Sequence, residues 1–428
     1  MKVLVVGGGG REHALCWALK RDLPHATLFV APGNPGTAQL GTNLPIPATA
    51  VADLVAAARR HTIDLTVIGP EAPLAAGLAD ALRAAGGAVF GPGAAAARLE
   101  SSKAFAKEVM ASSGVPTAAS RSFTELGAAL AYIRAHTEPL VVKASGLAAG
   151  KGAVVCDTRA EAAATARAML TDGKLGEAGR EIVIEQFLEG EELSVLALTD
   201  GERLAILPPV QDHKRLNEGD TGPNTGGMGA YCPVSLGTPA LLERVRREVL
   251  EPTLREMAQR RVPYTGVLYA GLMVSTDGTP FVLEFNCRFG DPETQAVFPI
   301  LPEGCTQHLA DIAAGRWQPT QPVLPAMRAA VTTVLAARGY PDTPERGAAI
   351  DVPTDLGPDV LVFHAGTARD GSGTLRAAGG RVLNVTALGA TVPEAARRSA
   401  AASERITFEG KTWRRDIAWR ELRRAGAA

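Results

Sequence analysis

The sequence predicts a multidomain protein of the α/β and α+β class, on three observations. Short β-rich runs alternate with alanine-rich helical stretches over the first hundred residues, a strand near residue 140 opens into a glycine-rich loop, and strand-rich segments follow. The 428 residues suggest roughly three domains. The 46 glycines and 29 prolines lie in short clusters, which indicates many defined turns in a globular chain.

The first hundred residues are expected to form a doubly wound parallel sheet. Candidate strands are residues 2–6, 27–30, 65–68 and 88–90, and each ends in a glycine-containing turn. Because strands alternate with helical stretches, we expect the strands to run parallel, with the turns gathered at their carboxyl ends. Such sheets bind ligands at that edge.

After residue 93 the pattern changes, and four unlike segments without an internal repeat predict four subdomains around one site. A helix is expected over residues 102–112, and a small inserted domain with strands 140–143 and 182–185 follows it. Residues 193–315 are rich in strands and polar motifs. From about residue 325 the candidate elements are strands 329–335, 360–364 and 381–385 and a helix at 393–405.

Charge and composition exclude several classes of partner. The formal charge is -1, from 44 basic and 45 acidic residues, so no overall field favours nucleic acid or an anionic membrane. No apolar run approaches the roughly 20 residues of a membrane span, and the apolar start of the chain is too short for a signal peptide. Five scattered cysteines without a C-x-x-C pair disfavour disulfides and zinc. We expect a cytoplasmic monomer that acts on small molecules.

The segment 282–293, V-L-E-F-N-C-R-F-G-D-P-E, is the strongest candidate for a metal site. Strict strand alternation puts Val282, Glu284 and Asn286 on one face and leaves Phe281, Leu283 and Phe285 for the core. An acid and an amide are hard oxygen ligands suited to Mg²⁺ or Mn²⁺. A strand with one solvated face explains the pair equally well. The charged turn R-F-G-D-P-E that follows favours the functional interpretation.

A second motif runs from Lys143 to Gly152, where a strand feeds a loop of small residues. Glycine amides can approach phosphate oxygens, and Lys151 adds charge. A Walker A loop would require Ser or Thr at Gly152. The alternative is an ordinary flexible hairpin loop.

The acidic turn after residue 184 is a candidate nucleotide hinge. Glu185 is placed to accept from an adenine amino group, and Glu192 from ribose hydroxyls. A solvated acidic turn is the commoner use of such a charge run.

Two further loops are candidates for substrate capture. Residues 211–215 and 219–231 lack regular periodicity, and a loop of this length in a compact protein is usually functional or disordered. A mobile surface loop is the alternative. At the N-terminus, Gly7–Gly10 join a strand to a helix start, where amides attract phosphate. A dinucleotide site is disfavoured because no acid ends the second strand, and His13 is assigned no chemistry.

Taken together, these motifs resemble a known family. Lys103, Lys143, K-A-S-G-L-A-A-G-K-G, E-Q-F-L-E-G-E-E and E-F-N occur in the order typical of ATP-grasp ligases. Further blocks, among them GGGGREHAL, VAPGNPGTA, DHKR, DTGPNTGGMGAY, EFNCRFGDPETQ and DIAWR, are similar to phosphoribosylamine–glycine ligase along essentially the whole chain. The resemblance implies that ATP, glycine and 5-phosphoribosylamine give glycinamide ribonucleotide, ADP and phosphate through glycyl phosphate, in purine biosynthesis.

The resemblance also implies roles for individual residues. Glu284 and Asn286 would hold Mg²⁺ or Mn²⁺, Arg288 would stabilise the transferring phosphoryl group or the carboxylate of glycine, and Asp212 and Asp291 would accept its ammonium group. The implied ATP contacts are Lys103, Lys143, Gly146, Gly150, Lys151, Gly152, Glu185, Phe187, Leu188, Glu192 and Lys214. The implied substrate contacts are Gly9, Gly10, Arg11, Glu12, Asn34, Pro70, Glu71, Asn224, Thr225, Gly226, Gly227 and Met228.

The implied organisation is an N-terminal α/β domain (1–100), an ATP-grasp core (101–121 and 192–324), an inserted lid (122–191) and a C-terminal α/β domain (325–428). Two departures from the family pattern stand out. Ser145 replaces the Asp of K-A-D-G, and the run from Leu268 to Met273 lacks the metal-binding acid that many ATP-grasp enzymes carry. Three other functions remain as alternatives: a bicarbonate-activating carboxylase of the purine pathway, a nicotinamide-dependent dehydrogenase and a non-catalytic nucleotide sensor.

Overall fold

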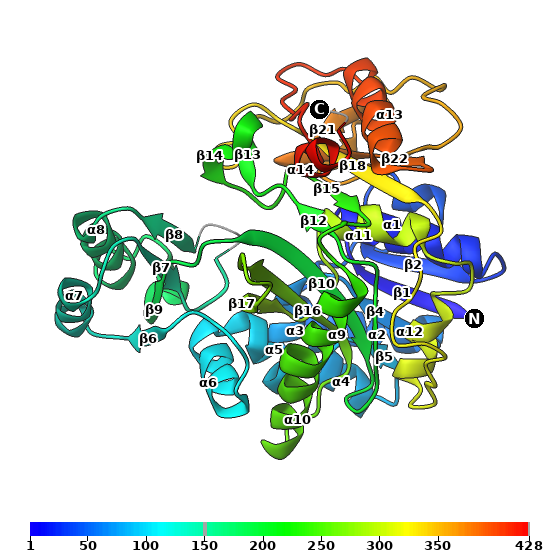
Figure 1. Cartoon of the computed structure of the whole chain (residues 1–428). Helices are drawn as coiled ribbons and strands as arrows, with labels where there is room; N and C mark the ends of the chain where they lie inside the picture. The colour runs from blue at the N-terminus through cyan, green and yellow to red at the C-terminus, as the bar shows by residue number, and fades with distance from the viewer. Residues whose placement is uncertain (149–151, 427–428) are drawn as a thin grey trace.

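The computed structural model describes residues 1–148 and 152–426, which form four parts (Figure 1). The first is a parallel sheet in the order β3-β2-β1-β4-β5, which confirms the predicted doubly wound sheet. Val3 to Val6 on the central strand are fully buried, as expected of a parallel strand covered on both faces. Its elements are β1 (Lys2–Gly7), α1 (Gly10–Asp22), β2 (Thr27–Pro32), β3 (Thr42–Asn43), α2 (Val51–His61), β4 (Leu65–Ile68), α3 (Glu71–Ala75), α4 (Leu78–Ala84), β5 (Val89–Phe90) and α5 (Ala94–Ser101).

The second part is the core, an antiparallel sheet in the order β11-β10-β16-β17. The helix expected at 102–112 is present as α6 (Lys103–Ser113). It begins after Ser102, whose side chain accepts from the Phe105 N–H, and ends at Gly114 with φ 69°. The other elements are β10 (Glu191–Thr199), β11 (Leu204–Ile206), α9 (Pro239–Val245), α10 (Glu251–Gln259), β16 (Gly266–Val274), β17 (Pro280–Asn286), α11 (Glu293–Val297) and α12 (Gln307–Ala313).

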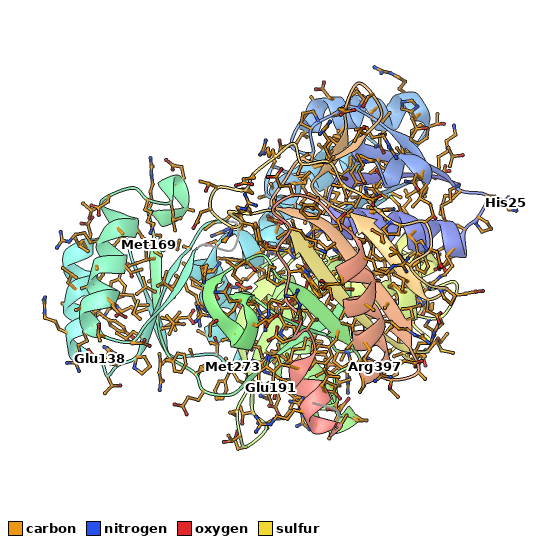
Figure 2. All side chains as sticks on the ribbon, turned by 90° about the horizontal axis from the view of Figure 1, so that it is seen from above. His25, Glu138, Met169, Glu191, Met273 and Arg397 are labelled. Atoms are coloured by element: carbon orange, nitrogen blue, oxygen red, sulfur yellow. The ribbon has the colours of Figure 1, made fainter. Side chains whose placement is uncertain are left out.

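The third part, the lid, is the antiparallel sheet β6-β9-β7-β8 with two helices. It projects to one side of the other parts, and Figure 2 shows it from above with Glu138 and Met169 labelled. Phe123, Val142 and Ile184 belong to a hydrophobic core that the lid forms by itself. Its elements are β6 (Ser120–Phe123), α7 (Leu126–Ala135), β7 (Leu140–Ala144), β8 (Ala153–Cys156), α8 (Arg159–Leu170) and β9 (Ile182–Gln186).

The fourth part is a C-terminal antiparallel sheet in the order β12-β15-β18-β22-β19, with α13 packed on β18 and β22. The sequence places β12 and β15 inside the segment 192–324 expected for the core, but β15 pairs with β18, with Tyr231 opposite Val331. The C-terminal sheet therefore reaches into the central region. Its elements are β12 (Gln211–Asp212), β15 (Gly229–Cys232), β18 (Ala329–Ala336), β19 (Val360–His364), β22 (Arg381–Gly389), α13 (Val392–Arg405) and α14 (Trp419–Arg424), with hairpins β13 (Arg215–Asn217)/β14 (Thr221–Asn224) and β20 (Thr367–Arg369)/β21 (Leu375–Ala377).

All five cysteines are free and buried. Burial raises the pKa of the Cys16 and Cys287 thiols, so both stay protonated and act as core residues. Within residues 1–148 and 152–426 no helix has the length and apolar character needed to cross a membrane.

Candidate active site

Strand β17 contains a β-bulge that changes which side chains face the site. Gly271 of β16 lies opposite Glu284 while the next residue, Leu272, lies opposite Val282, so Leu283 is the extra residue. Val282 is fully buried in the hydrophobic core together with Phe285, whereas Phe281 and Leu283 are partly exposed. The expectation of strict alternation is therefore wrong for Val282, Phe281 and Leu283. Glu284 and Asn286 still lie on the face opposite Phe285.

The bulge also directs a backbone acceptor toward the lid strand. Lys143, on β7, donates through Nζ to the Leu283 carbonyl oxygen at 3.0 Å. The same Nζ atom lies 2.8 Å from Glu185 Oε2. One lysine thus joins β17 to two lid strands, β7 and β9.

The positive charges around Glu284 keep its carboxylate ionised. Burial would raise the pKa of Glu284, but the charges of Lys103 and Lys143, followed by Lys214 and Arg288, outweigh burial and hold this pKa below its ordinary value. The carboxylate is therefore ionised at neutral pH, with the Asn286 amide two residues away. Among the described residues no group of three or more His, Cys, Asp or Glu side chains is arranged to hold a metal. One carboxylate plus one amide suits Mg²⁺, which usually keeps water and substrate phosphate oxygens among its ligands.

Glu185, expected to accept from adenine, is buried between two lysines. Lys107 Nζ lies 3.1 Å from its Oε1 and Lys143 Nζ lies 2.8 Å from its Oε2. Each carboxylate oxygen thus lies next to a lysine ammonium group. Sequence reasoning missed Lys107. Its position four residues after Lys103 on α6, hence on the same helix face, was an available signal.

Asp212, Lys214 and Glu192 form a second charged cluster. Lys214 Nζ lies 3.0 Å from Asp212 Oδ1 and also pairs with Glu192. Burial raises the pKa of Asp212 to about 6 against the opposing effect of Lys214, and the negative charges of Glu293 and Glu192 add to the rise. Glu191 and Met273, side by side in Figure 2, mark where β10 runs along β16 next to this cluster. The cluster brings three predicted site residues together.

Arg288 lies between acids from the N-terminal part. Its guanidinium is 3.0 Å from Glu100 Oε1 and 3.3 Å from Glu71 Oε2. The other oxygen of Glu100 accepts from the Cys287 N–H at 2.7 Å, so one buried carboxylate fixes both Arg288 and the residue that follows β17. Burial raises the pKa of Glu100. The sequence analysis did not single out Glu100, because a lone acid on a helix has no local signal of such a contact.

Asp291, expected to receive the ammonium group of glycine, is already paired. Arg381 Nη2 lies 3.2 Å from its Oδ2, and Gln295 donates to its Oδ1 at 2.8 Å. Burial would raise the pKa of Asp291, but Arg381 and Arg11 outweigh burial and lower it. Arg381 also donates to the Gly226 carbonyl oxygen at 2.6 Å. Asp291 therefore joins the turn after β17 to the C-terminal sheet through Arg381, which sequence reasoning missed.

The loop at residues 224–228 packs onto that same turn. Gly227 has φ 108°, and a Cβ atom there would lie 2.5 Å from Pro292 Cδ, so only glycine fits. Thr225 Oγ1 accepts from the Gly227 N–H at 3.0 Å, and its N–H donates to the Lys214 carbonyl oxygen at 2.7 Å. The Met228 N–H donates to the His213 carbonyl oxygen at 2.8 Å, and Asn224 lies opposite Arg215 in the hairpin. Backbone hydrogen bonds to His213 and Lys214 and the Arg381 contact with Gly226 hold this loop in place.

The N-terminal glycine turn, expected to receive a phosphate, lies next to two acidic side chains, those of Glu12 and Asp291. Glu12 accepts from the Gly9 N–H at 2.6 Å through Oε2, while its Oε1 lies 2.6 Å from Arg11 Nε. Asp291 also approaches, since a Cβ on Gly9 would lie 3.3 Å from its Oδ2. The Gly9 amide is thus not free for a phosphate, whereas Gly10 begins α1 as expected. The Asn34 side-chain amide donates to the carbonyl oxygens of Gly8 and His364, at 3.0 and 2.8 Å, and so links the turn to the end of β19.

The remaining predicted contacts lie at element ends. Gly146 N–H donates to the Ala178 carbonyl oxygen at 3.1 Å, and Gly152 accepts through its carbonyl oxygen from the Ala144 N–H at 2.7 Å, so these two residues at the ends of the glycine-rich loop are both hydrogen-bonded. Gly150 and Lys151 lie outside the described residues. Phe187 and Leu188, both partly exposed, follow β9, and Pro70 immediately precedes α3.

Comparison with known proteins identifies the family. Family models described as the N, ATP-grasp (A) and C domains of phosphoribosylglycinamide synthetase match residues 1–100, 101–294 and 330–420. A phosphoribosylamine–glycine ligase of Xanthomonas axonopodis is 47% identical over 433 residues, which cover 99% of each chain. The chain belongs to the phosphoribosylamine–glycine ligase family. The resemblance inferred from the motifs is confirmed.

Solved structures agree with this membership. The crystal structure of the phosphoribosylamine–glycine ligase from Thermotoga maritima is 36% identical with a TM-score of 0.85, and the match covers 97% of this chain and 100% of that one. The biotin carboxylase domain of the 2-oxoglutarate carboxylase from Hydrogenobacter thermophilus, solved with MgADP and bicarbonate, has a TM-score of 0.74 at 17% identity, covering 96% and 91%. At that identity only the fold is shared. As a member of its family the chain is an ATP-grasp ligase.

The terminal D-I-A-W-R block of this ligase, residues 416–420, and the adjacent Arg414 contact the segment that follows Asp212. Buried His213 accepts from the Ala418 N–H through Nε2 at 2.9 Å. Asp220 lies 2.7 Å from Arg414 and 2.6 Å from Arg420, and it accepts from the Trp419 indole N–H at 3.2 Å. The Arg414 side chain is only 1% exposed. The C-terminal segment therefore supports the segment that carries Asp212 and Lys214.

We expect Asp220→Ala to lower the free energy of unfolding by about 2 kcal/mol, because it removes a charged hydrogen-bond acceptor from buried Arg414, which keeps only Asp416 as a charged partner among the described residues. Urea unfolding followed by circular dichroism measures the change. The matched control is Glu404→Ala, whose partner Arg415 lies 3.5 Å away with both side chains more than 60% exposed. That control should change stability by less than about 1 kcal/mol. Equal effects of the two substitutions would show that the contacts between Asp220 and the C-terminal segment do not stabilise the folded protein.

Proposed function

We propose that this ligase joins glycine to 5-phosphoribosylamine with consumption of ATP, through glycyl phosphate, in purine biosynthesis. Carboxylates resist attack by amines because their oxygen is a poor leaving group, so the carboxylate of glycine is first phosphorylated. The amine then displaces phosphate and gives glycinamide ribonucleotide. The single observation that best supports the site is Arg288, held by Glu71 and Glu100 two residues beyond Asn286.

In this proposal the lysines bind the nucleotide. Lys103 and Lys143 neutralise the phosphates, the loop from Gly146 to Gly152 covers them, and Lys214 with Glu192 holds the ribose. Glu284 and Asn286 hold Mg²⁺ or Mn²⁺, and the ion, when bound, stabilises negative charge on the transferring phosphoryl group. Arg288 orients the glycine carboxylate and stabilises the charge that develops as it is phosphorylated.

The substrates occupy the region between the turn after β17 and the N-terminal part. Asp212 accepts the ammonium group of glycine. Asp291, already paired with Arg381, positions that arginine for the phosphate of phosphoribosylamine. Gly10 and Glu71 border the same region, where Glu71 lies 3.3 Å from Arg288.

A requirement for both substrates tests the function. ADP release should need glycine together with phosphoribosylamine, and glycinamide ribonucleotide should appear in equal amount. The nearest alternative, a carboxylase that activates bicarbonate, predicts ADP release with bicarbonate alone. That result would overturn the proposal.

The pH dependence of glycine use tests Asp212. Because the pKa of Asp212 is raised to about 6, its carboxylate is charged above pH 6 and protonated below. We expect kcat/KM for glycine to fall about tenfold per pH unit below 6, since this parameter reports groups of the free enzyme. Asp212→Asn should lower kcat/KM and remove this pH limb. An unchanged limb in the variant would assign the titration to another group.

A further inference from the structure

Ser145, which follows strand β7 at the start of the glycine-rich loop, links three segments of the chain. Its N–H donates to the Glu181 carbonyl oxygen at 2.8 Å, which ties it to the segment before β9. Its carbonyl oxygen accepts from the Lys103 N–H at 2.8 Å, and its Oγ accepts from the Ala104 N–H at 3.1 Å. The residue is only 4% exposed. Its polar atoms therefore form their hydrogen bonds within the protein and not with solvent.

These contacts determine where α6 begins. The first N–H groups of a helix have no partner within the helix. In α6 the N–H groups of Lys103 and Ala104 are satisfied by Ser145, and that of Phe105 by Ser102 at 3.2 Å. Lys103 is the first residue of α6, so its backbone is held directly against the end of β7.

The same strand carries Lys143 two residues before Ser145. The side chain of Lys143 is fixed by Glu185 and by the Leu283 carbonyl oxygen. Ser145 thus connects a lysine on β7 to a lysine on α6 through one residue. The separation between the two ammonium groups depends on how the first turn of α6 is attached.

We propose that Ser145 is a positioning residue for Lys103, and that its hydroxyl keeps Lys103 at the distance from Lys143 that nucleotide phosphates require. The proposal rests on the assignment of both lysines to the ATP phosphates. A hydroxyl supplies the acceptor for the Ala104 N–H without adding a negative charge beside the phosphates. Alanine at this position would leave that buried N–H unpaired and the turn free to shift.

Calorimetric titration with ADP and with adenosine tests this role. A lost hydrogen bond is worth about 1 kcal/mol, which corresponds to about a fivefold change in Kd. We expect Ser145→Ala to raise the Kd for ADP about fivefold and to leave the Kd for adenosine unchanged, because adenosine has no phosphate. General loosening of the site would weaken both ligands alike, and that result would overturn the proposal. The matched control is Ser113→Ala at the other end of α6, where Oγ donates to the Val109 carbonyl oxygen at 2.7 Å. It should bind both ligands normally.

A double-mutant cycle with Lys103→Met separates the inference from the function on which it rests. If Ser145 acts through Lys103, the double variant should bind ADP no more weakly than Lys103→Met alone. If the fold-losses in ADP affinity of the two single variants instead multiply in the double variant, Ser145 acts independently of Lys103, and this result would overturn the proposal. Normal ADP binding by Lys103→Met would instead remove the assignment of Lys103 itself. These two failures are distinct because only the second appears in the single lysine variant.

Discussion

Glu284→Gln should reduce turnover by roughly 10³-fold, since charge stabilisation by a bound metal contributes several kcal/mol. Glutamine keeps the size and an oxygen donor but removes the negative charge that Lys103, Lys143, Lys214 and Arg288 surround. Only Asn286 then remains beside it as a metal ligand from β17. We expect the loss to be partly restored by raising the Mg²⁺ or Mn²⁺ concentration.

Turnover measured against free metal concentration checks this prediction. Glu303→Gln is the control, because Glu303 is exposed and lies outside the site, and its metal dependence should match that of the unaltered protein. Turnover of Glu284→Gln within a few fold of normal at limiting metal would refute the assigned metal role. A loss that no metal concentration relieves, with normal stability, would indicate a role other than metal binding.

Arg288→Lys should lower turnover about 10²-fold while the protein remains folded. Lysine keeps the positive charge between Glu71 and Glu100 but lacks the planar fork that pairs with two oxygens at once. Loss of one preorganised donor to developing charge costs about 10²–10³-fold in turnover. Turnover with saturating glycine and ATP is the measurement, because the lost contact belongs to the reacting groups.

A double substitution separates this catalytic effect from stability. Arg288→Met leaves Glu100 buried without its cation, which should cost about 3–5 kcal/mol of folding free energy. Adding Glu100→Gln removes that uncompensated charge, so the double variant should regain most of the stability without regaining activity. Recovery of turnover in the double variant would show that Arg288 serves only to neutralise Glu100.

Much of the chemistry could be predicted from the sequence because it is local. Lys103, Lys143 and the E-F-N segment lie in order along the chain, and each follows a recognisable strand or helix start. The partners of these residues could not be predicted in the same way. Glu100 meets Arg288 across 188 residues of chain, and no local pattern records that contact.

Two further features of the site depend on tertiary contacts of this kind. One extra residue in a strand reverses the faces of the residues beyond it. The bulge at Leu283 therefore places Val282 in the core, and the Leu283 carbonyl oxygen accepts from Lys143. Glu185 is buried and pairs with Lys107 and Lys143, because a buried carboxylate is costly unless cations lie beside it.

By itself the sequence determined the fold class and the family, because periodicity, turn residues and the order of motifs are written along the chain. The tertiary structure decided which cation each candidate acid meets. Asp291 is paired with Arg381, which lies 90 residues away, whereas Asp212 and Glu192 both pair with Lys214. The physical reason is that charges are paired through space, and the spacing of residues along a chain does not specify which charges meet.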